Sequence, residues 1–117
     1  MLVGAEELDK LIPHRAPMIM IDSLLSYNDT KTVTGFTITE ENMFIEENIF
    51  SAYGMIENVA QTAAAGLGYY YYINNLKVPV GFIGAVSKLQ ITDYASVGDK
   101  LTTQVSIIAK LEQISIV

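Results

Sequence analysis

The chain has 117 residues, of which half are hydrophobic and 17% are charged, and its formal net charge is −6 at pH 7. This length predicts one domain, and the acidic balance argues against nucleic acid as a partner, because nucleic-acid binding depends on Lys and Arg side chains that neutralise phosphates. The absence of cysteine excludes disulfides, thiolate nucleophiles and thiolate metal sites, and we expect a cytoplasmic protein.

The high apolar content also bears on partners and membranes. So few charged residues indicate more apolar surface than one small core absorbs, and we expect a second subunit, most simply in a homodimer. The N-terminus lacks a basic region followed by an apolar run, so no secretory signal is predicted. Residues 55–73 are the most membrane-like stretch, but polar side chains in its first two turns favour a buried helix over a membrane span.

The first third of the chain predicts a short helix followed by two strands. Residues 5–12 are typical of a helix with acids in its first turn, and the proline that follows ends it. Residues 18–25 have the pattern of a mostly buried strand, and residues 30–39 alternate as a second strand after the turn residues Asn28 and Asp29. We expect these two strands to pair as an antiparallel hairpin.

A long, almost uncharged helix is the central predicted element. Residues 40–48 are acidic and irregular, which predicts a solvated loop that leads into this helix. The helix itself is predicted over residues 54–75, and its many Ala and Gly residues allow other backbone to approach closely.

The remainder of the chain predicts strands. Their patterns cover residues 79–85, 88–94 and 100–117, with a turn at residues 96–99. The compact solution is an α+β fold in which one antiparallel sheet wraps one long helix. The last pattern stops within an apolar run at Val117, as expected for a sequence that continues beyond this residue and completes a further strand.

Three separated motifs occur in a fixed order. They are residues 11–18 (Leu-Ile-Pro-His-Arg-Ala-Pro-Met), then Glu57 followed by Ala60 and Gln61, and finally residues 97–101 (Val-Gly-Asp-Lys-Leu). Together they resemble the β-hydroxyacyl-acyl-carrier-protein dehydratases of the hot-dog fold, in which a sheet wraps a central helix and two subunits join their sheets. The resemblance implies one hot-dog domain over residues 1–117, an acyl-carrier-protein thioester as substrate and Glu57 as the catalytic acid, with no cofactor or metal.

One position departs from the pattern of that family. The family has a His-Phe-Pro triplet before the helix, and Met43 stands at the place of its histidine, where a methionine cannot exchange a proton. Ser51 and Ala52 likewise replace a Pro-Gly pair. In this the chain is similar to a divergent branch from aryl-polyene pathways that keeps the acid and loses the triplet, which implies polyene or aryl-polyene intermediates as substrates.

Dehydration of a 3-hydroxyacyl thioester requires a base for the C2 proton, an acid for the C3 hydroxyl and donors for the developing oxyanion. Glu57 can act as acid and base in turn. The amides of Gly54 and Met55 are candidate donors, because the first turn of a helix leaves N–H groups without helical partners. His14, the only histidine, is the candidate replacement for the lost base; alternatively, it is a loop residue that bonds a backbone carbonyl.

Three more side chains are candidates for substrate binding. Gln61 lies one turn beyond Glu57 and either orients the carboxyl group or substrate, or satisfies a neighbouring backbone group. Tyr53 either contacts the substrate hydroxyl or closes the pocket with its ring, and Met43 either lines the pocket or fills the core.

These residues leave three functions open. The first is a homodimeric 3-hydroxyacyl-thioester dehydratase, a hydro-lyase, with Glu57 as acid/base. A hot-dog thioesterase, in which Glu57 activates water, would use the same pocket. The lost histidine also allows a non-catalytic subunit of an active dehydratase; a pocket open around Glu57 favours catalysis, and one filled by Met43 or Tyr53 favours the non-catalytic subunit.

Overall fold

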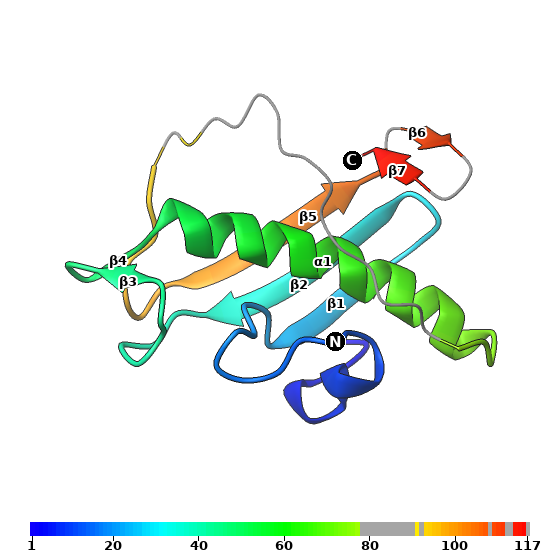
Figure 1. Cartoon of the computed structure of the whole chain (residues 1–117), viewed down its shortest axis with the longest axis horizontal. Helices are drawn as coiled ribbons and strands as arrows, with labels where there is room; N and C mark the ends of the chain where they lie inside the picture. The colour runs from blue at the N-terminus through cyan, green and yellow to red at the C-terminus, as the bar shows by residue number, and fades with distance from the viewer. Residues whose placement is uncertain (78–90, 92, 108, 112–113, 117) are drawn as a thin grey trace.

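The protein, shown by a computed structural model, has one long helix lying across an antiparallel sheet (Figure 1). The structure describes residues 1–77, 91, 93–107, 109–111 and 114–116. The helix is α1 (Ala52–Ile73), and the sheet has the order β1 (Ser23–Tyr27), β2 (Lys31–Thr37) and β5 (Lys100–Ser106). Because α1 contacts all three strands, the arrangement confirms the predicted α+β class with a central helix.

The predicted hairpin of β1 and β2 is confirmed. Asn28 closes its turn, since the side-chain oxygen accepts hydrogen bonds from the amides of Thr30 and Lys31, both at 2.9 Å. β2 then pairs antiparallel with β5 over the whole length of both strands. At the other edge of the sheet, the N-terminal segment meets β1, where the Leu24 amide donates to the Val3 carbonyl at 2.8 Å.

The first helix and the first strand are both shorter than predicted. Residues 5–12 contain the 3-10 helix η1 (Ala5–Lys10), and the strand begins at Ser23 and not at residue 18. The carbonyl of residue 18 and both backbone groups of residue 20 bond side chains of α1. An apolar run cannot show whether the backbone partner is a strand or a side chain, so the boundary was wrong.

The predicted loop at residues 40–48 contains part of a small hairpin. β3 (Ile45–Glu46) pairs antiparallel with β4 (Ile49–Phe50), and the two connecting residues, Glu47 and Asn48, have φ values of 50° and 68°. Two successive residues with positive φ are typical of a type I′ turn, which matches the twist of paired strands. Asn tolerates this region better than most residues, but a Glu there gives no such signal in the sequence.

The strand predicted over residues 100–117 is wrong as a single element. After β5, the short strands β6 (Ala109–Leu111) and β7 (Ile114–Ile116) pair with each other antiparallel. An alternating pattern does not show where a strand folds back. The strand predicted at residues 79–85 lies outside the described residues, as does most of that at 88–94, whose described residues Ile91, Asp93 and Tyr94 lie in no strand.

The turn predicted at residues 96–99 is confirmed. The Asp99 amide donates to the Ser96 carbonyl at 3.0 Å, and the Asp99 carboxylate accepts from the Ser96 amide at 2.9 Å. Between these two residues, Gly98 has a φ of 95°, a left-handed conformation that glycine adopts without steric cost.

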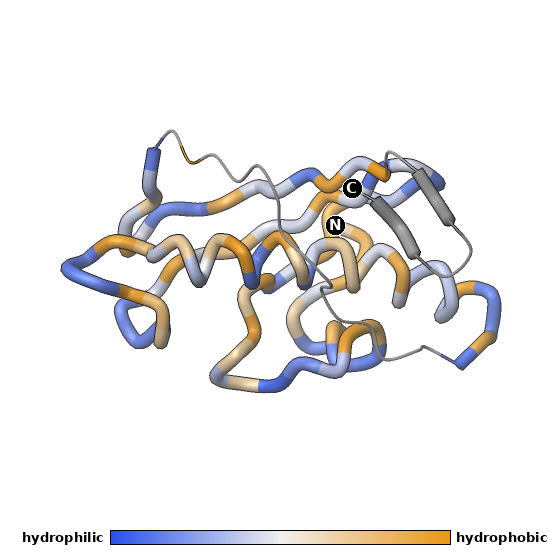
Figure 2. Tube along the Cα trace, turned by 45° about the horizontal axis from the view of Figure 1, so that its top comes forward, coloured by the Kyte–Doolittle hydropathy of each residue, from blue (hydrophilic) through white to orange (hydrophobic). Residues whose placement is uncertain are grey.

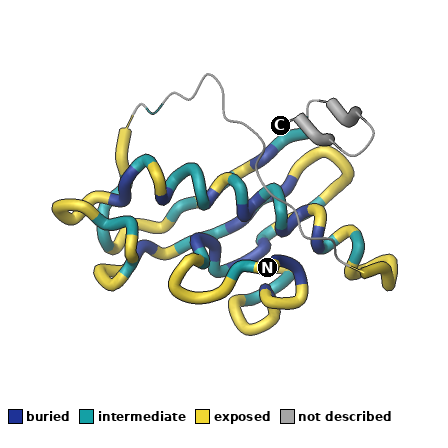
Figure 3. The backbone as a smooth tube through the Cα atoms, in the orientation of Figure 1, coloured by how far each residue is buried: buried dark blue, intermediate teal, exposed yellow. Residues whose placement is uncertain are grey.

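Among the described residues, two hydrophobic clusters lie between α1 and the segments packed against it. The first joins η1 and the segment after it to β1 and the second half of α1; its buried members are Leu8, Leu11, Ile12, Ile21, Leu24 and Ala65. The second, near the start of α1, has as its buried members Met20, Ile38 and Phe50. Hydrophobic residues occur along α1 and along the N-terminal segment beside it (Figure 2), and buried positions recur along α1 (Figure 3).

Glycines let two segments approach α1 closely. A Cβ at Gly68 would overlap the backbone carbonyl of Leu11, and one at Gly66 would overlap the side chain of Thr32. Glycine has a low intrinsic helix propensity, and the close packing at these two positions offsets that loss of helix stability. In the part of the chain that is described, no helix is both long enough and apolar enough to cross a membrane.

Candidate active site

The two residues predicted to be catalytic lie side by side. Glu57 is in the second turn of α1 and His14 is in the loop that follows η1, and His14 Nε2 is 3.7 Å from Glu57 Oε1. The side chain of Glu57 is 27% exposed and that of His14 is 23% exposed, so both are partly buried and both remain accessible to a ligand. A carboxyl group and an imidazole at this distance need only a small side-chain movement to come within hydrogen-bonding reach and exchange a proton.

Glu57 differs from most other acidic residues of the chain. Among the described Asp and Glu residues, only Glu57 and Asp22 are partly buried, and the others are exposed. Asp22 has a structural partner, because its carboxylate accepts a hydrogen bond from the Thr37 amide at 2.8 Å. Within the described residues, Glu57 has no Lys or Arg partner, and its only ion-pair neighbour is His14.

The loop that carries His14 is stabilised by Arg15. One guanidinium nitrogen of Arg15 donates to the carbonyls of Ile12 at 2.9 Å and His14 at 2.8 Å, and the Arg15 carbonyl accepts from the Met18 amide at 2.9 Å. His14 Nδ1 is buried and has no hydrogen-bond partner among the described residues. The other ring nitrogen of His14, Nε2, is the one that faces Glu57.

Gln61 satisfies both roles that the sequence left open. Its Nε2 donates to Glu57 Oε1 at 3.2 Å and to the Met18 carbonyl at 2.7 Å, and its Oε1 accepts from the Met20 amide at 2.6 Å. The side chain is completely buried, so these hydrogen bonds are its substitutes for water. Gln61 thus contacts the carboxyl group and a neighbouring backbone segment at the same time.

Asn58 is a residue that sequence reasoning missed. Its Nδ2 donates to the Met20 carbonyl at 2.7 Å, and its Oδ1 accepts from Thr103 Oγ1 of β5 at 2.6 Å. The signal was present: Asn58, Gln61 and Thr62 are polar, they share one helix face at i, i+3 and i+4, and that face is buried. Polar residues on a buried face are expected to have specific partners.

The free amides at the helix start differ from those predicted. α1 begins two residues earlier than expected, with Ser51 as its N-cap, so the Gly54 amide bonds Ser51 Oγ at 3.5 Å and the Met55 amide bonds the Ser51 carbonyl at 3.1 Å. Among the described residues, the helix-start amides without an acceptor are those of Ala52 and Tyr53. The sequence missed this because Ser51 was not recognised as a cap.

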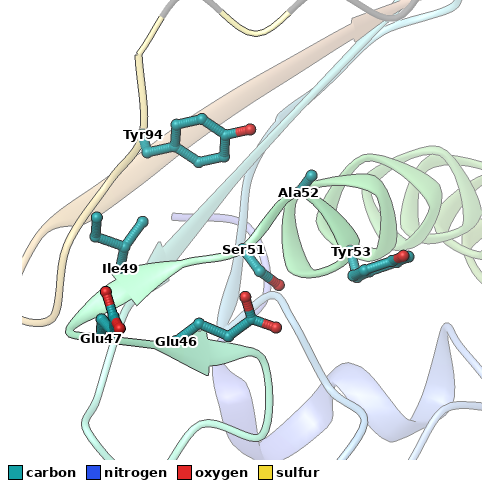
Figure 4. Close-up of a pocket in the computed structure, with 7 residues that line it drawn as sticks. All are labelled: Glu46, Glu47, Ile49, Ser51, Ala52, Tyr53 and Tyr94. Carbon is teal, nitrogen blue, oxygen red and sulfur yellow. The ribbon is translucent and has the colours of Figure 1, made fainter.

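A hollow of about 580 Å³ adjoins this helix start (Figure 4). Its lining residues are Glu46, Glu47, Ile49, Ser51, Ala52, Tyr53 and Tyr94. Tyr53 is therefore the one predicted substrate-binding residue that lines it, with a side chain that is largely exposed. Met43 is 51% exposed and does not fill the core, whereas Gly54 is buried.

No group of three or more His, Asp or Glu side chains within the described residues has the geometry of a metal site. The pair of His14 and Glu57 brings together an imidazole and a carboxyl group, two groups that can each carry a proton.

Comparisons with known proteins identify the family and support the fold. The model of the ApeP-like family, described as ApeP dehydratase, matches residues 6–116. The 3-hydroxyacyl-acyl-carrier-protein dehydratase FabZ of Latilactobacillus sakei is 26% identical over 116 residues, which cover 91% of this chain and 78% of that protein. FabZ of Chlamydia trachomatis is 27% identical over 112 residues, or 86% of this chain and 70% of that protein.

Among solved structures, the dehydratase heterocomplex ApeI:P from Xenorhabdus doucetiae matches with a TM-score of 0.77 and 17% identity, covering 92% of this chain and 75% of the matched chain. This likeness confirms the predicted hot-dog fold. Since the family match extends over nearly the whole sequence, the chain belongs to the ApeP-like dehydratase family.

Proposed function

We propose that this protein dehydrates 3-hydroxyacyl thioesters of an acyl carrier protein, with Glu57 as the acid/base and His14 as its partner. The observation that carries the proposal is the 3.7 Å distance between His14 Nε2 and Glu57 Oε1. It is supported by the relatives that are named 3-hydroxyacyl-acyl-carrier-protein dehydratases. The acyl group that we propose is a polyene or aryl-polyene chain, in keeping with the resemblance of the sequence to that branch.

The pair supplies the proton transfers that dehydration requires. Neutral His14 takes the proton from C2 of the thioester, and Glu57, as a carboxylic acid, gives its proton to the C3 hydroxyl, which leaves as water while the double bond forms between C2 and C3. Transfer of a proton from the imidazolium to the carboxylate then restores both groups. The products are a 2-enoyl thioester and one water molecule, so atoms and charges balance.

The direct test is to incubate the purified protein with a 3-hydroxyacyl carrier-protein thioester and to follow its mass. We expect loss of one water, and we expect Glu57→Gln to lower the rate by about 10² to 10⁴. Asp22→Asn is the matched control, because Asp22 is the other partly buried carboxylate and lies outside the pair. Loss of the acyl group in place of water would identify a thioesterase. No turnover by the wild type, with Glu57→Gln indistinguishable from it, would exclude both enzymes, and turnover that Glu57→Gln leaves unchanged would exclude Glu57 as the acid/base.

A second candidate function is a non-catalytic subunit beside an active dehydratase. It is favoured by Met43 at the place of the family histidine and by the similarity to a chain of a dehydratase heterocomplex. This function predicts no dehydration by the chain alone, and a complex with a dehydratase partner that keeps its full rate when Glu57 is changed to Gln. Size measurement of the isolated chain separately tests the predicted homodimer.

A further inference from the structure

The segment of residues 18–20 is bonded to side chains of a helix where a strand would normally provide backbone partners. The Met18 carbonyl accepts from Gln61 at 2.7 Å, the Met20 amide donates to Gln61 at 2.6 Å, and the Met20 carbonyl accepts from Asn58 at 2.7 Å. Two amide side chains one turn apart thus reproduce the hydrogen bonding of a neighbouring strand. We name Asn58 and Gln61 the amide clamp.

The clamp leaves the segment little freedom to move. Asn58 is 2% exposed and Gln61 is completely buried, so a displacement that broke these bonds would leave buried donors and acceptors unpaired. Each such group typically costs about 1–3 kcal/mol. The oxygen of the Asn58 side chain is also held in place, because Oδ1 accepts a hydrogen bond from Thr103 Oγ1 of β5 at 2.6 Å.

The His14 loop has a second anchor on the same helix. Leu11 is buried, and its carbonyl lies where a side chain at residue 68 would be, so the loop begins against Gly68. The loop ends in the clamp, and between the two anchors Arg15 bonds the carbonyls of Ile12 and His14. The position of His14 along α1 is therefore determined at both ends of its loop.

Gln61 links the clamp to the acid as well. The same Nε2 atom that donates to the Met18 carbonyl also donates to Glu57 Oε1 at 3.2 Å. One side chain therefore contacts the carboxyl group and the segment that follows His14. Both members of the pair are aligned by contacts within a single chain.

We propose that Asn58 and Gln61 are positioning residues, which hold His14 beside Glu57 by clamping residues 18–20 onto α1. The expected loss of rate rests on the proposed function, whereas the placement of His14 by the clamp does not depend on that function. A shift of about 1 Å in a catalytic group can lower a rate by about 10². Weakening the clamp is therefore expected to lower kcat while leaving substrate binding largely intact.

The single histidine gives a structural test that needs no turnover. In the full chain, labelled with 15N-histidine and freed of any affinity tag, the imidazole gives one set of nitrogen signals. The nitrogen signals of an imidazole depend on the groups that face its two ring nitrogens. We expect Glu57→Gln to change these signals, and we expect Asn58→Ala and Gln61→Met to change them in the same direction.

Thr34→Val is the matched control, since Thr34 is fully buried and its hydroxyl bonds that of Thr62, one residue from the clamp, and not Glu57 or residues 18–20. It should keep the wild-type imidazole signals. If Gln61→Met does not fold, as judged by circular dichroism, Gln61→Glu replaces it, because it retains the acceptor for the Met20 amide and loses both donors.

Two results would overturn the proposal: folded clamp variants with wild-type imidazole signals, or a Glu57→Gln variant with unchanged signals. In the kinetic arm, Asn58→Ala should lower kcat by about 10² with KM changed less than about twofold. An unchanged kcat in an active protein would also contradict it. A wild-type protein without dehydratase activity would count against the proposed function alone, because the nitrogen signals would still report the clamp.

Discussion

The two halves of α1 are attached to the rest of the chain by different means. In the first half, Asn58, Gln61 and Thr62 turn polar groups inward and are held by hydrogen bonds to the segment of residues 18–20, to β5 and to β2. In the second half, small residues such as Gly66 and Gly68 allow backbone and side chains to pack directly against the helix. Hydrogen bonds are directional, so they specify the orientation of the half of α1 that carries Glu57. The other half of α1 contributes mainly close packing.

The largest change in stability is expected from Gly68→Ala, which tests the closely packed second half of α1. The new Cβ would overlap the backbone of Leu11, which cannot rotate away as a side chain can. We expect the free energy of unfolding to fall by about 3 kcal/mol, as for other overpacked sites, despite the better helix propensity of Ala. Urea denaturation measures it, with Leu67→Ala, at an exposed neighbouring position, as a control expected to stay within about 0.5 kcal/mol. Equal stabilities for the two variants would contradict close packing at residue 68.

A smaller effect is expected from Thr62→Val in the hydrogen-bonded half. Thr62 donates to the Asn58 carbonyl at 2.8 Å, so Thr34, 2.7 Å away, is the donor in the bond between the two hydroxyls. Removing the Thr62 hydroxyl leaves that of Thr34 buried and unpaired, at a cost of about 1.5 kcal/mol.

The double variant Thr34→Val with Thr62→Val sharpens this test. With both hydroxyls replaced by methyl groups of similar shape, no buried donor remains at the Thr34 position. We expect the two substitutions to be non-additive by about 1 kcal/mol in a double-mutant cycle of unfolding free energies. Strict additivity would mean that the hydroxyls do not interact.

Ser51→Ala should have a smaller effect again, because it touches only the beginning of the hydrogen-bonded half. The hydrogen bond from the Gly54 amide to Ser51 Oγ is long, at 3.5 Å, so the loss of the cap should cost about 0.5 kcal/mol, at the low end for such residues. Thermal unfolding followed by circular dichroism measures this. A change above about 2 kcal/mol would show that Ser51 has a further structural role.

The smallest effect is expected at an exposed ion pair of η1. The hydrogen bond and charge of Glu7 raise the pKa of Lys10, and the two side chains are 3.0 Å apart, but both are well exposed. Exposed pairs of this kind contribute little in water. Lys10→Ala should leave the unfolding midpoint unchanged at neutral pH, and a measurable loss of stability would point to an interaction beyond the ion pair.

The sequence allowed the fold to be predicted where local signals agree with the tertiary structure. The turn at Asn28, the turn containing Gly98 and the long central helix all have the residues that their geometry requires. The family resemblance added the hot-dog arrangement; the catalytic role of Glu57 that it also implies stays a prediction. These signals were sufficient because they depend on residues close together in the chain.

Long-range contacts explain what was not predicted. Residue 20 appeared to belong to a strand because nothing local reveals that its partners are Asn58 and Gln61, about forty residues away. The proximity of His14 to Glu57 depends on the same contacts, so the sequence offered His14 only as one of two alternatives. Asn58 was passed over because its neighbours in sequence are apolar, although its spacing from Gln61 and Thr62 marked a polar stripe on a buried face.

The backbone pairing of Val3 with Leu24 affects whether a strand of another molecule can pair with β1. An edge strand offers its free amides and carbonyls to any extended segment, which makes such edges frequent starting points for unwanted association between molecules. Here the chain covers that position on β1 with its own beginning, since the amides of Leu2 and Val3 both donate to the Leu24 carbonyl. Trimming the first three residues would uncover the position, and the shortened protein should aggregate sooner at high concentration than the intact one.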